Sequence, residues 1–347
     1  MTRPDDLTRT APDAPPSGDP LIVLQSVKPP TSRTNPYIVQ LVRSLSEQLE
    51  VRYFSWRTGL LGRYHVFHLH WPEVMLRREG RLQRWAAMGR FALLMLRLSV
   101  QRRIAVVRTV HNVGAHESGG RLERLLLAWC DRRTDHWIAL NEQTRPPREG
   151  PLTVILHGDY RDWFESYQRP PSISGQILYF GLIRPYKGID ALLAAFAATT
   201  DPGLRLRIVG RPVTGQLRAQ VQDAVRADER ISAVLDYVDD ETLATEVGQA
   251  ELVVLPYQDI HNSGALLLAL SLDRPALVPR APVTVALAAE VGAAWVPTYA
   301  GPLTAAALSE ARAALPSGAG AGRPDLSRRG WPLIAAQHAA LYQSVRS

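Results

Sequence analysis

The stretch Gln176-Ile-Leu-Tyr-Phe-Gly-Leu-Ile-Arg-Pro-Tyr-Lys-Gly-Ile-Asp190 decides how the rest of the chain is interpreted. Its apolar run ends in Gly181, which predicts a buried parallel strand running into a tight turn. Arg184 and Lys187 follow, and Gly188 separates them from an apolar segment that predicts a helix. A helix N-terminus offers free N–H groups to an anion, and arginine and lysine add positive charge. We therefore expect a phosphate-binding site here, with two solvated surface cations as the alternative.

Composition sets the class of protein and the kind of partner. The chain has 347 residues, 46% of them hydrophobic, so it can bury two ordinary cores. Its net charge is +7, which favours anionic partners such as nucleotides, lipid head groups or nucleic acid. Lys28 and Lys187 are its two lysines among 40 basic residues, so a lysine in this stretch is not compositional noise. The single cysteine, Cys130, excludes an intramolecular disulfide and fits a cytoplasmic protein.

Strands and helices alternate after residue 20, which predicts an α/β fold with two parallel, doubly wound sheets. Strands are expected at 21–24, 51–55, 66–69, 104–110, 136–140, 154–156, 176–180, 204–209, 231–234, 251–255 and 275–278. Helices are expected at 37–49, 122–130, 187–199, 214–227, 240–249, 263–271, 283–291 and 328–345. We expect a disordered tail at 1–19, domains at 20–168 and 169–325, and a last helix at 326–347 that packs on the first domain. No signal peptide is visible. No uninterrupted apolar run reaches about 18 residues, so we expect no transmembrane helix.

Residues 77–103 combine apolar side chains with eight arginines and one glutamate. A basic amphipathic helix with tryptophan and phenylalanine can lie in a membrane interface. The alternative is an ordinary domain helix that packs one face on a sheet and exposes its arginines. The pattern predicts a peripheral membrane surface, on the inner face of the cell membrane, without excluding the ordinary helix.

Ligands of open parallel sheets bind beyond the carboxyl ends of the strands, so residues that follow strands are the candidates for a site. In the second half, Arg211 and Tyr237 are expected beside a phosphate and a nucleobase. Asn262 or Ser263 can cap the helix that starts near Gly264, and its free N–H groups then face a phosphate. Two such strand ends in one domain suit a diphosphate. In the first half the candidates are the segments 70–73, 111–112 and 157–160.

These motifs resemble the GT-B glycosyltransferases, close to the family-4-like group, over nearly the whole chain after residue 20. The stretch 180–188 is similar to the family's sugar-nucleotide diphosphate loop, which implies Gly181, Arg184 and Lys187 at the donor phosphates. Thr109-Val-His-Asn112 is similar to a strand end that implies His111 near the transferred sugar. The segment 68–73, with the histidines and glutamate at 111–117, resembles bacterial β-mannosyltransferases of exopolysaccharide assembly. The resemblance implies two Rossmann-like domains facing a cleft.

One departure affects the expected mechanism. Retaining family-4 enzymes carry two glutamates eight positions apart around the glycine turn, and here His261 and Ala269 occupy those positions. Retention of configuration and the usual ribose contact are therefore in doubt. An inverting reaction needs a base within about 3 Å of the acceptor hydroxyl. The candidates are His111, His116, Glu117 and Glu73.

The resemblance predicts an enzyme that moves a hexose, with mannose favoured, from a nucleotide-diphosphate sugar to a glycan or lipid-linked acceptor. GDP-mannose is the first expectation for the donor and a UDP-sugar the second, with no cofactor. A metal is not expected, because His68 and His70 share a strand face without a third ligand. The alternatives are a nucleotide-sugar epimerase and a non-catalytic, membrane-associated partner of an active transferase. Nucleic-acid binding is not expected, because no basic-and-aromatic stacking motif is present.

Overall fold

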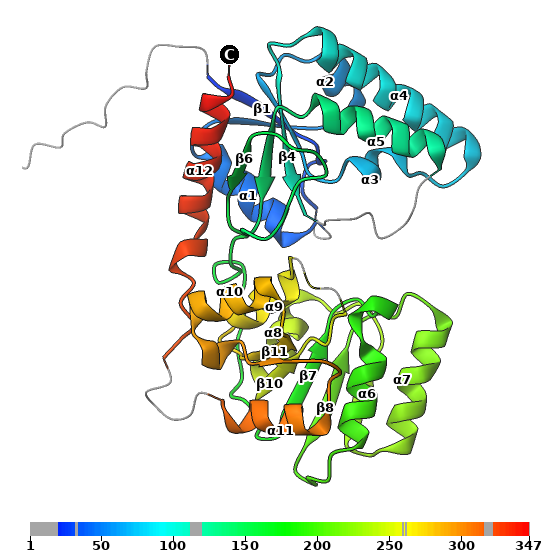
Figure 1. Cartoon of the computed structure of the whole chain (residues 1–347), viewed down its shortest axis with the longest axis vertical. Coiled ribbons are helices and arrows are strands. Elements are labelled where there is room, and N and C mark those ends of the chain that lie inside the picture. Colours follow the sequence, from blue (N-terminus) through cyan, green and yellow to red (C-terminus); the bar gives the residue numbers. More distant parts are fainter. Residues whose placement is uncertain are drawn as a thin grey trace, which may run out of the picture.

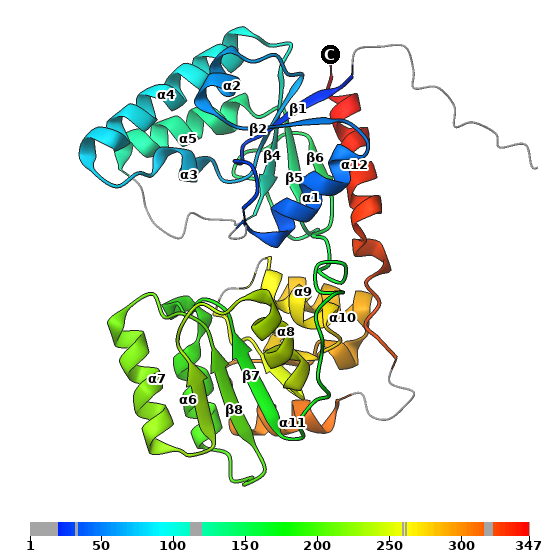
Figure 2. The ribbon, with the colours of Figure 1, turned by 180° about the vertical axis from the view of Figure 1, so that it is seen from behind.

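The structure is a computed structural model, and it describes residues 20–31, 34–111, 120–258, 260, 262–315 and 322–346. Two α/β domains lie one above the other, and the last helix runs alongside the N-terminal one (Figures 1 and 2). Each domain contains a six-stranded sheet in which every recorded strand pair is parallel. The predicted α/β fold with two doubly wound sheets is therefore confirmed. The expected tail at 1–19 lies outside the described residues.

The N-terminal sheet has the order β2-β1-β3-β4-β5-β6. Its strands are β1 (Ile22–Gln25), β2 (Glu50–Tyr53), β3 (Val66–Leu69), β4 (Ala105–Val110), β5 (His136–Ala139) and β6 (Leu152–Val154). Successive side chains of a strand point to opposite faces, so the apolar runs serve two cores at once. Val66 joins the core cluster under one face, and its neighbour Phe67 joins the cluster under the other.

Helices cover both faces of this sheet. One face carries α2 (Trp56–Leu61), α3 (Pro72–Leu76), α4 (Arg81–Val100) and α5 (Arg121–Arg133), which pack on one another (Figure 1). The other carries α1 (Pro36–Ser46) and α12 (Trp331–Ser344). Asn35 begins α1 by accepting a hydrogen bond from the Tyr37 N–H. Among the described residues, no helix is both long and apolar enough to cross a bilayer.

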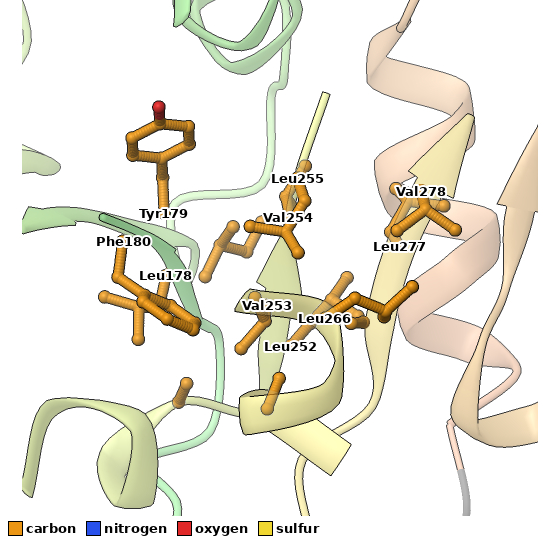
Figure 3. Close-up of a cluster of buried hydrophobic side chains, with 14 of the residues drawn as sticks. Leu178, Tyr179, Phe180, Leu252, Val253, Val254, Leu255, Leu266, Leu277 and Val278 are labelled. Carbon is orange, nitrogen blue, oxygen red and sulfur yellow. The ribbon is translucent and has the colours of Figure 1, made fainter. Parts of the chain in front are cut away.

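The C-terminal sheet has the order β12-β11-β10-β7-β8-β9. Its strands are β7 (Gln176–Phe180), β8 (Arg205–Val209), β9 (Ile231–Val234), β10 (Leu252–Val254), β11 (Ala276–Pro279) and β12 (Thr298–Tyr299). Its α-helices are α6 (Ile189–Ala197), α7 (Gly215–Ala227), α8 (Asp240–Gln249), α9 (Gly264–Ser271), α10 (Pro282–Val291) and α11 (Ala305–Ala313). Figure 3 shows side chains of β7, β10 and β11 gathered with Leu266 of α9 in one core. This core supports the strand ends where the phosphate site is expected.

The last helix, α12, links the two domains. It follows a short 3-10 helix, Ser327–Arg329, and packs against α1. Trp331, Ile334, Leu341 and Tyr342 are buried members of the core cluster formed with β1, β3, β4 and β5. The chain therefore returns to its N-terminal domain after completing the C-terminal one.

Several local expectations need correction. The helices α2 and α11 and the short strand β12 were not predicted from the sequence. They contain six, nine and two residues, respectively, which is too few for a clear hydrophobic period. Asp239, one residue before the expected helix at 240–249, caps α8 by accepting from the Thr242 N–H.

Candidate functional site

The strand order fixes where a ligand can enter the C-terminal domain. From β7 the chain proceeds to β8 and β9 on one side of the sheet, and β10, β11 and β12 lie on the other side. The crevice between the carboxyl ends of β7 and β10 is therefore the topological switch point, where open α/β sheets bind ligands. The segment 181–188 follows β7 and the segment 255–264 follows β10. The two predicted phosphate-binding turns thus lie at this one switch point.

Lys187 occupies the centre of this switch point. Its Nζ lies 4.9 Å from the centroid of the Tyr257 ring, a cation–π contact between the two segments. Burial, followed by the charge of Arg184, lowers the pKa of Lys187 to about 8. No ion pair neutralises Arg184 or Lys187 within the described part of the chain. Two uncompensated cations, one of them largely desolvated, make a site that favours an anion.

Glycines allow the two segments to approach each other. Gly188 has a φ of +66°, and a Cβ there would lie 2.0 Å from the Pro256 carbonyl oxygen. The Gln258 N–H donates to the Tyr186 carbonyl at 2.9 Å, which fixes the same contact. Gly181 has a φ of +103°, a region that side chains with a Cβ rarely adopt. The backbone of 181–188 is therefore held against the turn that leads to α9.

The N-terminus of α9 completes the site. Ser263 caps it by accepting from the Leu266 N–H at 3.1 Å, as one of the two expected capping residues. Burial raises the pKa of Tyr257, and the nearby Ser263 hydroxyl acts in the opposite direction. The Tyr257 ring thus contacts Lys187, and its hydroxyl lies near the α9 cap. The positive end of the α9 dipole and the two cations converge on one place.

Asn262 connects this turn to the N-terminal domain. Its side-chain amide donates to the backbone carbonyl of His111 at 2.9 Å. Its Oδ1 accepts from the Asn141 side chain at 2.6 Å. Asn262 therefore touches the ends of β4 and β5 while its neighbour Ser263 caps α9. The turn at 262–264 and His111 thus face each other across the domain boundary.

His111 belongs to a buried hydrogen-bonded network at the carboxyl edge of the N-terminal sheet. Its Nε2 lies 3.1 Å from Nδ1 of His70, and Nε2 of His70 lies 2.9 Å from Oε1 of Gln25. The Gln25 amide nitrogen lies 3.4 Å from the Tyr342 hydroxyl, which lies 2.7 Å from Nδ1 of His68. The His68 Nε2 then lies 2.7 Å from the Thr109 hydroxyl. We call these six residues the histidine chain: His111, His70, Gln25, Tyr342, His68 and Thr109.

The surroundings keep this network uncharged. Burial, then His338, lowers the pKa of His70 to about 3. Burial, followed by His70, holds the pKa of His111 well below its usual range. Trp71 stacks on the His111 ring with centroids 4.1 Å apart. A neutral His111 can accept a hydrogen bond from a substrate hydroxyl, and its lowered pKa makes it a weaker base than free histidine.

The remaining predicted site residues are exposed, half-buried or outside the described residues. Arg211 is exposed after β8, and its carbonyl accepts from the Ile183 N–H of the 181–188 segment at 3.0 Å. Tyr237 is exposed by 69%, and no hydrogen bond among the described residues joins it to that segment. Glu73 is half-buried in the first turn of α3, and no hydrogen bond among the described residues joins it to the histidine chain. His116, Glu117 and His261 lie outside the described residues, so they stay predictions.

Gln25, Asn141 and Tyr342 were not among the predicted site residues. Gln25 ends a strand, and Asn141 follows one shortly, so the rule that ligands lie beyond strand ends could have indicated both. Tyr342 sits in a helix 274 residues from His68, and its sequence pattern is that of a core residue. His68 and His70, considered as metal ligands, use all four ring nitrogens in hydrogen bonds to protein groups. Within the described ranges, no group of three metal-binding side chains is assembled.

A cavity of about 330 Å³ lies between the domains beside the donor turn. Asn141 and His157 line it from the N-terminal domain, and Ser263 and Glu290 line it from the C-terminal domain. Arg329 closes it by pairing with Glu290 at 2.8 Å and donating to the His157 carbonyl at 3.1 Å. The volume is at the lower end of known ligand pockets. The α9 N-terminus therefore has open space next to it on the domain boundary.

Comparison with known proteins gives relatives in both sequence and structure. The GDP-mannose:glycolipid 4-beta-D-mannosyltransferase of Xanthomonas campestris pv. campestris is 47% identical over 327 residues, covering 93% of this chain and 92% of the relative. Sucrose-phosphate synthase from Thermosynechococcus elongatus aligns with a TM-score of 0.62 at 17% identity, over 94% of this chain and 99% of that one. Anabaena HepE in complex with UDP aligns with a TM-score of 0.59 at 14% identity, over 93% and 100%. No family model matches the chain. The structural likenesses confirm the predicted GT-B fold.

Proposed function

The chain belongs to the glycosyltransferase family of the Xanthomonas GDP-mannose:glycolipid 4-beta-D-mannosyltransferase, and from this premise we propose that it transfers mannose from GDP-mannose to a glycolipid. The observation that carries the proposal is the convergence of Lys187, Arg184 and the α9 N-terminus at one switch point. These groups supply the positive charge that a leaving diphosphate needs. The proposal includes no metal or other cofactor.

The β-linkage in the relative's name bears on the mechanism. GDP-mannose holds its mannose in α-linkage, so a β-linked product requires inversion at the anomeric carbon in a single displacement. This agrees with the absence of both glutamates of the retaining pattern, whose positions are His261 and Ala269. We propose that His111 contacts the sugar or the attacking hydroxyl. His116 and Glu117, which follow it in the chain, remain candidates for the base.

Nucleotide binding tests the proposal directly. Calorimetry with GDP, UDP, ADP and TDP should give GDP as the tightest ligand of the wild-type protein. Lys187→Ala should weaken GDP binding by roughly 10- to 100-fold, because a hydrogen bond to a charged group contributes about 1.5–3 kcal/mol. Lys28→Ala, the matched removal of the other lysine, should leave the affinity unchanged. Binding of none of the four nucleotides would overturn the donor site, and tighter binding of UDP would overturn the choice of donor.

Incubation with GDP-mannose, with and without a glycolipid acceptor, separates a transferase from the alternatives. A transferase releases GDP in proportion to the mannosylated glycolipid and leaves the donor sugar otherwise unchanged. Interconversion of GDP-mannose with a second GDP-sugar, without acceptor, would instead show an epimerase. Tight GDP binding with neither reaction would favour a non-catalytic partner.

We further propose that α4 seats the enzyme on a membrane, where a glycolipid acceptor resides. Its apolar residues form two stripes with spacings of three or four positions. One stripe, with Phe91, Leu94 and Leu98, is buried in the core. The other is exposed: Leu82 by 86%, Trp85 by 61%, Leu93 by 56%, Leu96 by 51% and Val100 by 74%. Exposed arginines flank it at 78, 81, 84 and 90, so it matches an anionic lipid surface.

Vesicle sedimentation tests this surface. Burying one leucine side chain contributes about 1.5–3 kcal/mol, whereas one arginine near an anionic surface contributes about 1 kcal/mol. Leu93→Gln with Leu96→Gln should therefore weaken binding to phosphatidylglycerol-containing vesicles more than tenfold, even at high salt. Leu333→Gln, a change of an exposed leucine on α12, is the matched control and should bind like wild type. Unchanged binding by the α4 double variant would show that this stripe does not meet the membrane.

A further inference from the structure

The histidine chain has a direction that can be worked out from its acceptors. Oε1 of Gln25 is a carbonyl oxygen and can only accept, so the hydrogen between it and His70 resides on Nε2 of His70. A neutral imidazole carries one hydrogen, so Nδ1 of His70 is an acceptor. The hydrogen between His70 and His111 therefore resides on Nε2 of His111. Nδ1 of His111 is then left with a free lone pair.

The Gln25 amide is placed with its oxygen toward His70 and its nitrogen toward Tyr342, and the other end of the chain can be satisfied in the same direction. Its NH2 group donates to the Tyr342 hydroxyl, and that hydroxyl donates its single hydrogen to Nδ1 of His68. His68 in turn donates from Nε2 to the Thr109 hydroxyl. If the amide were reversed, its NH2 group would face Nε2 of His70 and every hydrogen along the chain would have to move. Tyr342, from the last helix, thus helps to determine which nitrogen of His111 is protonated.

Nδ1 of His111 has no recorded hydrogen-bond partner among the described residues, although the residue is buried. It is not among the buried, unsatisfied side-chain atoms. The His111 carbonyl is held by Asn262 of the donor turn, so the residue lies at the domain boundary. The free lone pair therefore belongs to a buried residue that contacts the turn at 262–264.

We infer that Gln25, His70 and Tyr342 are positioning residues that hold His111 in its Nε2–H tautomer, so that Nδ1 accepts a hydrogen bond from a substrate hydroxyl. The inference rests on the proposed function, because it assigns His111 a substrate contact. It adds that the protonation of a residue at the domain boundary depends on a hydroxyl supplied by α12. Loss of the Tyr342 hydroxyl would thus change the tautomer of His111, although Tyr342 makes no recorded hydrogen bond to His111.

Charged and titratable groups around His111 come from several elements. They are His70 after β3, Arg108 in β4, Tyr37 in α1 and His157 after β6. None is a carboxylate, so no described neighbour would favour an imidazolium at position 111. The tautomer is therefore set by hydrogen bonds and not by an ion pair.

Nitrogen NMR of the full-length protein, labelled with ¹⁵N-histidine and free of ligand, tests the tautomer itself. His111→Asn identifies the His111 signals by their loss. We expect the wild-type protein to show a protonated Nε2 and an unprotonated Nδ1 at position 111. A protonated Nδ1 would overturn the inference.

Three variants test the positioning residues. Gln25→Leu and Tyr342→Phe should each convert His111 to the Nδ1–H form or to a mixture of both tautomers. Tyr64→Phe is the matched control, because it removes another buried hydroxyl of this domain, one that donates to the Gly59 carbonyl at 2.7 Å. It should leave the His111 signals as they are. If folded Gln25→Leu and Tyr342→Phe proteins keep the wild-type His111 signals, these residues do not set the tautomer.

Transfer kinetics link the tautomer to function. Tyr342→Phe should lower kcat about tenfold, the effect of losing one hydrogen bond in the transition state, with little change in the KM for GDP-mannose. GDP binding should be unchanged, because the donor cations are intact. If the NMR result holds but no transfer is found in any protein, the proposed function fails while the tautomer assignment stands. If the tautomer changes and kcat does not, His111 makes no such substrate contact.

Discussion

Burying the charged Lys187 side chain beside Arg184 lowers the stability of the folded protein. The ammonium group is largely buried there, and its pKa falls from 10.5 to about 8. Between these two values the unfolded chain binds more protons than the folded one, so stability rises with pH there. Below pH 8 the full penalty of the buried charge is present. A bound diphosphate would remove this penalty, which is how a binding site can be destabilising by itself and favourable with its ligand.

Replacing the lysine by an uncharged side chain should expose this penalty. In urea denaturation without nucleotide, the stability of Lys187→Met relative to wild type should be greater at pH 7 than at pH 10. The difference between the two pH values should be on the order of 2 kcal/mol, since one pKa unit corresponds to about 1.4 kcal/mol. Lys28→Met, at an exposed position, should show no such pH dependence. An equal effect of Lys187→Met at both pH values would contradict the buried-charge account.

Residue by residue, local sequence pattern indicated that Arg184, Lys187 and Ser263 follow strand ends, but it did not indicate the contacts of the histidine chain. Arg184, Lys187 and Ser263 stand next to glycines at strand ends, a local pattern visible in a few positions. The partners of His68 and His70 come from three separate segments, and the Tyr342 contact spans 274 residues. No local periodicity carries such a contact. His338 is fully buried, and its Nδ1 lies 2.8 Å from the Ile334 carbonyl oxygen.

At the scale of single elements, the turn from β7 to α6 depends on a backbone that only glycine adopts easily. Gly188→Ala should destabilise the protein by at least about 2 kcal/mol, because a left-handed alanine costs about 1–2 kcal/mol and its Cβ would meet the Pro256 carbonyl. Gly215→Ala, at the open start of α7, should change stability by less than about 1 kcal/mol and can be stabilising. Chemical denaturation of both variants compares them. Equal stability of the two would show that the β7 turn tolerates a side chain.

Element positions followed from hydrophobic pattern where strands are buried on both faces. The bounds of β3 and β7 are those predicted, because their mostly apolar, buried runs mark such strands clearly. The bounds of β9 are also those predicted, although it is an edge strand in which only Ile231 is buried. The faces of α4 could not be assigned in the same way. Its sequence carries apolar residues on two opposite sides, and only the packing of the domain decides which stripe is buried.

At the scale of the whole molecule, α12 makes the N-terminal domain depend on the end of the chain. Ending the protein after Gly330 removes four large side chains from that core: Trp331, Ile334, Leu341 and Tyr342. At about 1.5–3 kcal/mol each, their loss is comparable to the whole stability of a typical domain. Hydrogen exchange should therefore show β1 to β6 unprotected while β7 to β12 stay protected. Removal of residues 345–347 alone is the control, and a protected N-terminal sheet in the longer truncation would contradict this expectation.

The same helix imposes an order of events on the ribosome. The last N-terminal strand ends at Val154, whereas α12 begins at Trp331. At about 5–20 residues per second, translation needs roughly 10–35 s to cross that interval. During this time the nascent N-terminal domain lacks the apolar cover that α12 provides, and a chaperone has access to that face. Newly made protein thus acquires its complete N-terminal core only after the C-terminal domain has been synthesised.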